Sequence, residues 1–117
     1  MSDHEALLRR AYEAFNARDI EGALALMHED VDWPNGIEGG REHGHAAVRA
    51  YWKRQFLLVS SNVEPRSFAT NEQGRMVVRV HQVVHNLCGE LVSDREVIHA
   101  YSIRDDLIER MDIVEAA

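Results

Sequence analysis

The chain changes its hydrophobic period once, and this change limits the folds open to it more than any other feature. Up to residue 58, apolar side chains recur at intervals of three and four residues, which is typical of amphipathic helices. From residue 63 onward, valine-rich segments are separated by short turns, which is typical of strands and hairpins. We predict helices over residues 3–17, 20–27 and about 45–58, a short strand at 31–33, and strands over 63–70, 75–87, 91–103 and 107–115.

This order predicts an α+β fold. Helices that are segregated from an antiparallel meander pack on one face of it, so the three N-terminal helices should cover one face of a curved sheet. Asp19 stands at the start of the second helix, where an aspartate side chain is a good N-cap.

Length, charge and cysteine content narrow the class of protein. The 117 residues predict a single domain, 1–117. A net charge of −7 without a basic block argues against a nucleic-acid partner. No apolar run is long enough for a membrane helix, and "MSDHEALLRR" has no signal-peptide core. The single cysteine, Cys88, fits a reducing, cytoplasmic location.

The stretch "VVRVHQVVHNL" carries His81 and His85 four residues apart. On a helix this spacing would place both imidazoles on one face, where they could share a metal ion. On a strand the two residues lie roughly 13 Å apart at ~3.3 Å per residue. Each ligand of one zinc ion must lie about 2.0–2.1 Å from it. We therefore expect no metal at this pair.

Three stretches carry a resemblance to a known family: "AYEAFNARDIEGALALMHEDVDW" at 11–33, "GHAAVRAYW" at 44–52 and "YSIRDDLIERMDI" at 101–113. They resemble the SnoaL-like branch of the nuclear transport factor 2-like superfamily, which includes ketosteroid isomerases and polyketide cyclases. The resemblance implies a cone-shaped, cystatin-like α+β barrel. It also implies a pocket for a small apolar molecule and a homodimer through the outer sheet face. Such a fold hosts many activities and does not by itself give function.

The ketosteroid isomerase site does not carry over to this chain. Aligned on "NARD", the family's tyrosine falls at Ala11, its general-base aspartate at Asn35 and its protonated aspartate near His99. None of the three is retained, so a strict ketosteroid isomerase is not expected.

The pattern alone leaves open which face of the strand 75–87 points inward. Met76, Val78 and Val80 form the more apolar face, which composition would place in the core. The resemblance instead implies that His81, Val83 and His85 point inward and that the apolar face forms a dimer interface. We adopt the second interpretation. By the same resemblance His99, Tyr101, Arg110 and Asp112 face the pocket.

A candidate site follows from this choice. The expected ligand-binding residues are Trp33, Asn35, Tyr51, Trp52, Phe56, Val83, Tyr101 and Arg110. We predict His99 as general base, oriented by Asp112, with His81 or His85 as the acid. The expected chemistry is cofactor-free isomerisation, cyclisation, dehydration or hydrolysis of an apolar cyclic carbonyl compound. Two alternatives stay open: a purely structural His99–Asp112 hydrogen bond, and a non-catalytic ligand-binding or scaffold module.

Overall fold

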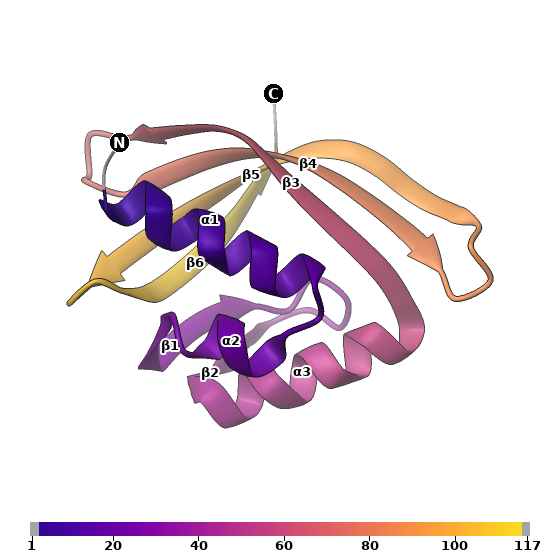
Figure 1. Ribbon diagram of the computed structural model, residues 1–117. Coiled ribbons are helices and arrows are strands. Elements are labelled where there is room, and N and C mark those ends of the chain that lie inside the picture. The colour runs from indigo at the N-terminus through magenta and orange to yellow at the C-terminus, as the bar shows by residue number, and fades with distance from the viewer. Residues whose placement is uncertain (1–2, 116–117) are drawn as a thin grey trace.

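The computed structural model describes residues 3–115 and contains three helices and six strands (Figure 1). In chain order they are α1 (Asp3–Asn16), α2 (Ile20–Leu24), β1 (Met27–Pro34), β2 (Arg41–His43), α3 (Gly44–Leu58), β3 (Val59–Thr70), β4 (Met76–Asn86), β5 (Leu91–Arg104) and β6 (Leu107–Glu115). No helix among these residues is long and apolar enough to cross a membrane.

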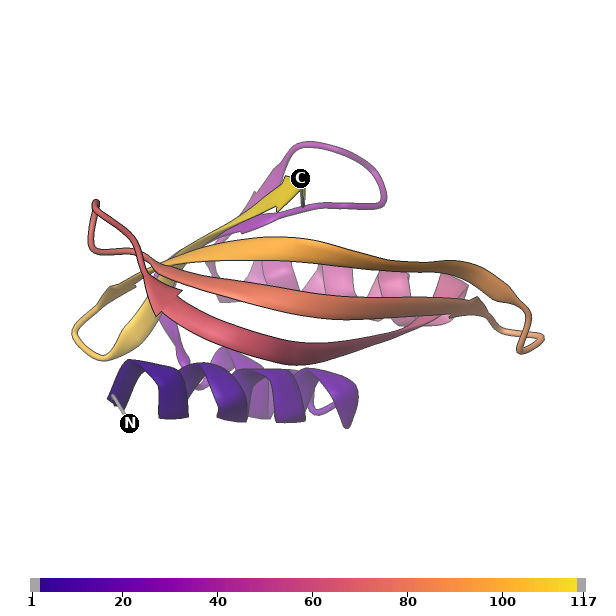
Figure 2. The ribbon, with the colours of Figure 1, turned by 90° about the horizontal axis from the view of Figure 1, so that it is seen from above.

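The six strands form one sheet in the order β2-β1-β6-β5-β4-β3. All pairings are antiparallel except that of β1 with β6, which is parallel. Figure 2 shows the long strands β3, β4 and β5 side by side, with α1 running along β3. The sheet curves around the helices without closing, because β2 and β3 remain edge strands. The predicted α+β class and curved sheet are confirmed.

The first part of the chain differs from the prediction in three elements: the second helix, β1, which spans Met27–Pro34 where 31–33 was predicted, and β2. The second helix ends at Leu24, because Met27 already begins β1, and His28 therefore lies on a strand. Asp19 caps this helix as predicted, since its side chain accepts a hydrogen bond from the Gly22 N–H. Strand β2 was not predicted. Its three residues pair with the end of β1, as in Asp32 opposite His43.

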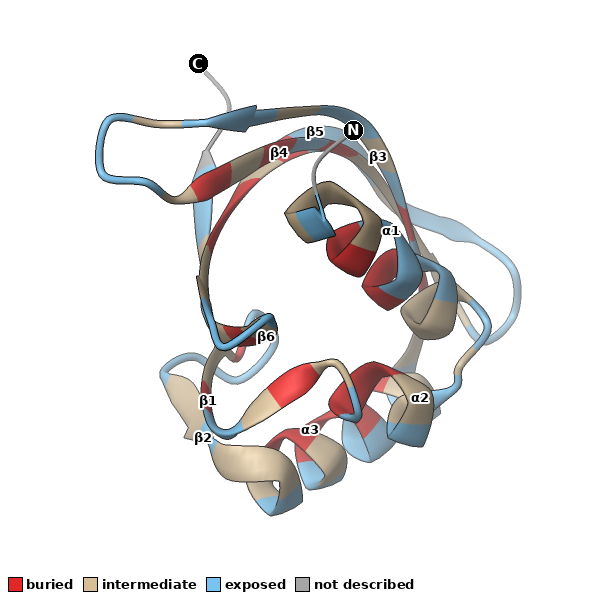
Figure 3. Cartoon of the chain, turned by 60° about the vertical axis from the view of Figure 1, so that its left-hand side comes forward, coloured by how far each residue is buried: buried red, intermediate tan, exposed pale blue. Residues whose placement is uncertain are grey.

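The predicted orientation of β4 is wrong. Met76, Val78 and Val80 are 6%, 0% and 0% exposed, and they pack in the core beneath the helices. Figure 3 shows buried residues along the strands that curve around the helices. Because side chains alternate along a strand, His81, Val83 and His85 lie on the outer face. Burial of the more apolar face decides the orientation, and a dimer interface made of Met76, Val78 and Val80 is thereby excluded.

Candidate functional site

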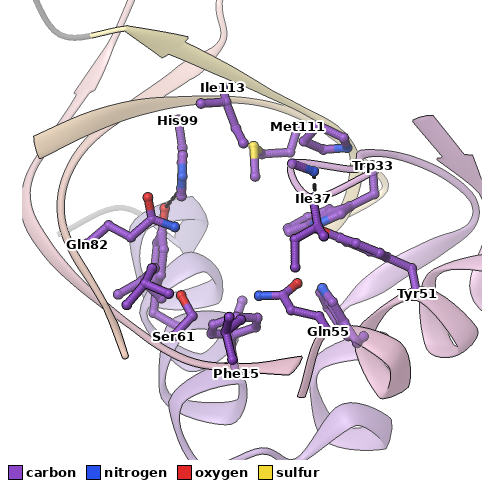
Figure 4. Close-up of a pocket in the computed structure, with 18 of the residues that line it drawn as sticks. Phe15, Trp33, Ile37, Tyr51, Gln55, Ser61, Gln82, His99, Met111 and Ile113 are labelled. Carbon is purple, nitrogen blue, oxygen red and sulfur yellow. Dashed lines mark hydrogen bonds between the residues drawn. The ribbon is translucent and has the colours of Figure 1, made fainter. Parts of the chain in front are cut away.

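A cavity of about 470 Å³ lies between the concave face of the sheet and the helices (Figure 4). Its walls are mainly apolar and come from both layers, including Phe15 of α1, Trp52 of α3, Val63 of β3 and Met111 of β6. The ring of Trp52 packs edge-on against those of Trp33 and Phe15, with ring centroids 5.5 and 5.8 Å apart. The aromatic residues therefore form a rigid wall.

A buried hydrogen-bonded cluster of Tyr12, His99 and Tyr101 forms the polar part of one wall. The Tyr101 hydroxyl donates to the Tyr12 oxygen at 2.8 Å, and the Tyr12 oxygen lies 2.8 Å from His99 Nδ1. All three side chains line the cavity and are at most 5% exposed. Tyr12 comes from α1, whereas His99 and Tyr101 lie two apart on β5 and so share its inner face.

Burial keeps this cluster uncharged. It lowers the pKa of His99 to about 4, because a charged imidazolium would lose its hydration there. Burial also raises the pKa values of Tyr12 and Tyr101. At neutral pH the cluster consists of two phenols and a neutral imidazole.

The direction of the hydrogen bonds decides what the cluster offers to a ligand. If Tyr12 donates to His99 Nδ1, the imidazole proton is on Nε2, which has no hydrogen-bond partner among the described residues. If Nδ1 carries the proton and donates to Tyr12, the Tyr12 hydroxyl hydrogen becomes free instead. Either tautomer leaves one donor in the cluster for an oxygen acceptor in the cavity.

Five predicted site residues do line the cavity: Trp33, Tyr51, Trp52, His99 and Tyr101. Tyr51 also holds the β1–β2 loop, because its hydroxyl oxygen accepts a hydrogen bond from the Gly36 N–H at 3.1 Å. Burial raises the pKa of Tyr51.

Asp112 does not meet His99, and the predicted dyad is absent from the structure. Strand pairing places His99 opposite Ile113 and Ala100 opposite Asp112, so Asp112 and Arg110 point away from the cavity. Asp112 accepts hydrogen bonds from Arg110, Arg75 and Arg41 at 2.7–3.1 Å. The hydrogen bonds from Arg110 and Arg75, together with the charges of Arg110 and Arg41, lower the pKa of Asp112 to about 2. The residue is a structural ion-pair centre outside the cavity.

The remaining predicted site residues also lie elsewhere. His81, on the outer face, pairs with Asp94, with 2.6 Å between Nε2 and Oδ1. His85 and Val83 share that outer face with it. Phe56 packs behind the cavity wall against Phe15.

Asn35 is buried, and its side chain stabilises the β1–β2 loop instead of lining the cavity. Its side-chain oxygen accepts hydrogen bonds from the backbone N–H groups of Ile37 and Glu38. Its amide donates to the carboxylates of Glu38 and Glu42. It has no place among the cavity-lining residues.

Tyr12 is the main site residue that was not predicted. It stands one position after Ala11, onto which the family alignment had placed the tyrosine. The helical spacing Leu8–Tyr12–Phe15 indicates that Tyr12 faces inward, because intervals of four and three residues place all three side chains on the buried face of α1.

Within residues 3–115, no group of three or more His, Cys, Asp or Glu side chains is arranged to hold a metal ion.

Comparison with known proteins agrees with this architecture. A family model described as a SnoaL-like domain matches residues 8–111. Among curated proteins none matches the sequence. The structure of TerC co-crystallised with polyporic acid is similar, with a TM-score of 0.85 and 29% identity over 98% of this chain and 92% of that one.

Two further structures share the fold. One is an NTF2-like protein of unknown function from Burkholderia pseudomallei, with a TM-score of 0.85 and 25% identity over 99% of this chain and 92% of that one. The other is a Mycobacterium tuberculosis protein in complex with estradiol-17β-hemisuccinate. It has a TM-score of 0.80 and 21% identity over 95% of this chain and 92% of that one.

Proposed function

This chain belongs to the SnoaL-like domain family, and on that premise we propose that its cavity binds a small, largely apolar ring compound with a carbonyl oxygen. The observation that carries the proposal is the apolar cavity with a neutral Tyr12–His99–Tyr101 cluster in its wall. An aromatic wall with a few polar groups is typical of small-molecule sites. TerC, the similar protein at 29% identity, was crystallised with polyporic acid.

The carbonyl oxygen accepts a hydrogen bond from the cluster. A neutral imidazole or a phenol that donates to a carbonyl oxygen stabilises negative charge developing on it, as at an oxyanion hole. Carbonyl polarisation is the step shared by the isomerase and cyclase chemistry proposed for this site. His99 or Tyr12, according to the tautomer, then acts as the electrophilic donor, and the low pKa of His99 makes the imidazole a poor base at neutral pH.

The second candidate function is binding without chemistry. Among the described residues that line the cavity none is a carboxylate, and the histidine has a pKa of about 4. A general base works best when its pKa lies near the operating pH. This composition favours a binding module over an enzyme that depends on proton abstraction by a side chain.

Binding can be tested with 4-acetylbiphenyl, a rigid two-ring ketone. Both tryptophans of the chain, Trp33 and Trp52, line the cavity, so their fluorescence should change saturably on titration. Tyr12→Phe removes one hydroxyl of the cluster and should weaken binding roughly tenfold. His81→Gln on the outer face is the matched control and should bind as the wild type does. A fluorescence change that never saturates would contradict the proposal.

Catalysis can be separated from binding by α-proton exchange. In D2O, 2-tetralone exchanges its α-protons faster when its carbonyl is polarised. Exchange that is faster than in buffer, and lost in His99→Gln, supports chemistry at the cluster. Exchange at the buffer rate, despite saturable binding, supports the binding module.

The homodimer and the cytoplasmic location also remain proposals. The outer face of β4 and β5 carries partly buried apolar residues, Val83 and Ile98, beside ion pairs such as Arg79–Glu96. Such a mixed face is compatible with self-association. Sedimentation should give a dimer mass that Ile98→Glu reduces to that of a monomer, whereas a monomeric wild-type chain would contradict the dimer.

The cytoplasmic location rests on the single cysteine.

A further inference from the structure

A buried hydroxyl in the cavity wall has no hydrogen-bond partner. Ser61, near the start of β3, is 2% exposed, and its Oγ forms no hydrogen bond with any described residue. A buried polar atom left unpaired destabilises the folded chain, and such atoms are rare in native proteins. Ser61 lines the cavity, so a molecule inside it could satisfy this group.

Gln55 provides a second unpaired polar group in the same part of the wall. It lies in the last turn of α3, is 9% exposed and lines the cavity. Its side-chain amide forms no hydrogen bond with the rest of the described chain, and its polar atoms are less completely buried than the Ser61 Oγ. Figure 4 shows the polar ends of Gln55 and Ser61 directed into the cavity along the side of the view opposite His99.

Strand register separates Ser61 from His99 along the sheet. Ser61 pairs with Val84 of β4, whereas His99 pairs with Val78. Six residues along β4 correspond to roughly 20 Å at ~3.3 Å per residue. Phe15, Val63 and Met111 also line the cavity.

We propose that Ser61 and Gln55 form a second hydrogen-bonding subsite, which recognises a neutral hydroxyl at the end of the ligand opposite its carbonyl. This inference rests on the proposed function and specifies its ligand class: a rigid apolar body with one oxygen at each end. A hydroxyl both donates and accepts, and so do the serine hydroxyl and the glutamine amide. Among the described lining residues, Arg95 is the one with a formal charge, and it is exposed.

Matched probes test the subsite. The first pair is 4-acetylbiphenyl and 4-acetyl-4′-hydroxybiphenyl; the second, longer pair is 3-deoxyestrone and estrone. In the wild type the added hydroxyl should tighten binding in at least one pair by roughly five- to tenfold. Ser61→Ala and Gln55→Leu should reduce this advantage to less than twofold. Ser67→Ala, an exposed serine on the same strand, should retain it.

A stability measurement separates a ligand subsite from a structural role. Because the Ser61 hydroxyl is unpaired, Ser61→Ala should unfold at the same urea concentration as the wild type or a higher one. A variant that loses stability would show that the hydroxyl has a structural partner, and would overturn the inference.

The binding outcomes distinguish the two proposals. If the probes of each pair bind equally well, the second subsite is wrong and the proposed function stands. If the 4′-carboxylate analogue of 4-acetylbiphenyl binds more tightly than the hydroxyl compound, the subsite takes an anion and the inference is overturned. If none of the probes binds, the proposed function fails, and the inference fails with it.

Discussion

His99 illustrates how far the surroundings of one residue determine its chemistry. The inward orientation that the family resemblance implied for His99 and Asp112 suggested a base assisted by a carboxylate. In the structure its partner is the Tyr12 phenol, and burial lowers its pKa to about 4. The same imidazole is therefore a neutral hydrogen-bonding group at physiological pH.

The low pKa of His99 makes folding sensitive to mild acid. Between its folded pKa of about 4 and its unfolded value of 6.5, the unfolded chain binds more protons. The free energy of unfolding therefore falls as the pH drops from 6.5 toward 4, by about 3 kcal/mol in total. NMR titration of the histidine Cε1–H signals should give a pKa near 4 for His99. A value near 6.5 would contradict the buried, neutral state.

Asp112 contributes to stability through its ionised form. Hydrogen bonds from Arg110 and Arg75 lower its pKa from 3.8 to about 2, so its contribution is present above pH 3.8 and is lost as the pH falls toward 2. Asp112→Asn should lower the free energy of unfolding at pH 7 by about 2 kcal/mol. Urea denaturation measures this change. Glu72→Gln, in the exposed β3–β4 turn, is the control and should have no effect.

At the scale of elements, the orientation of β4 was the decisive error. Both faces of this strand carry valines, so the pattern permitted two interpretations, and the resemblance favoured the wrong one. A shift of one residue exchanges the faces of a whole strand. The apolar content of the Met76–Val80 face was the better guide, because burying that face removes more apolar surface from water.

Val78→Thr and Val77→Thr test this orientation directly. Val78 is fully buried, so a hydroxyl placed there loses hydration and should cost about 1–3 kcal/mol of stability. Val77, its neighbour on the outer face, should tolerate the same change within about 0.5 kcal/mol. Chemical denaturation of the two variants gives the comparison. Equal losses would contradict the observed orientation.

Local signals predicted most of the elements. Helical spacing and the Asp19 cap located the helices, and valine-rich segments bounded by turns located the strands β3 to β6. The parallel pairing of β1 with β6 and the short β2 were not predictable, because both depend on contacts between distant segments. The prediction of the site was partly wrong for the same reason. Whether Asp112 meets His99 depends on strand register, which no local pattern determines.

At the scale of the whole molecule, the cavity exists because the sheet curves without closing and the helices cover its concave side. Residues from seven elements line the cavity, α1, α3 and the strands β1 and β3 to β6. The site is therefore a property of the complete fold, and a substitution that loosens either layer should weaken binding along with stability.

Affinity for an uncharged ligand should be independent of pH over the neutral range. The pKa of His99 is about 4, and burial raises the pKa values of the cluster tyrosines above their usual value of 10. None of these groups changes charge between pH 6 and 9. The dissociation constant of 4-acetylbiphenyl, followed by tryptophan fluorescence, should vary less than twofold over that range. A transition centred near pH 7 would instead indicate a titrating group in the site.

α3 continues into β3 without a loop, and this connection affects how the two segments unfold locally. α3 ends at Leu58 and β3 begins at Val59, whose backbone N–H bonds to the carbonyl of Gln55. With no loop between them, the last turn of the helix and the first residues of the strand should open as one cooperative unit. Their amide hydrogens should then exchange with solvent at similar rates, and a molecule held by both Gln55 and Ser61 should slow that exchange in the two segments together.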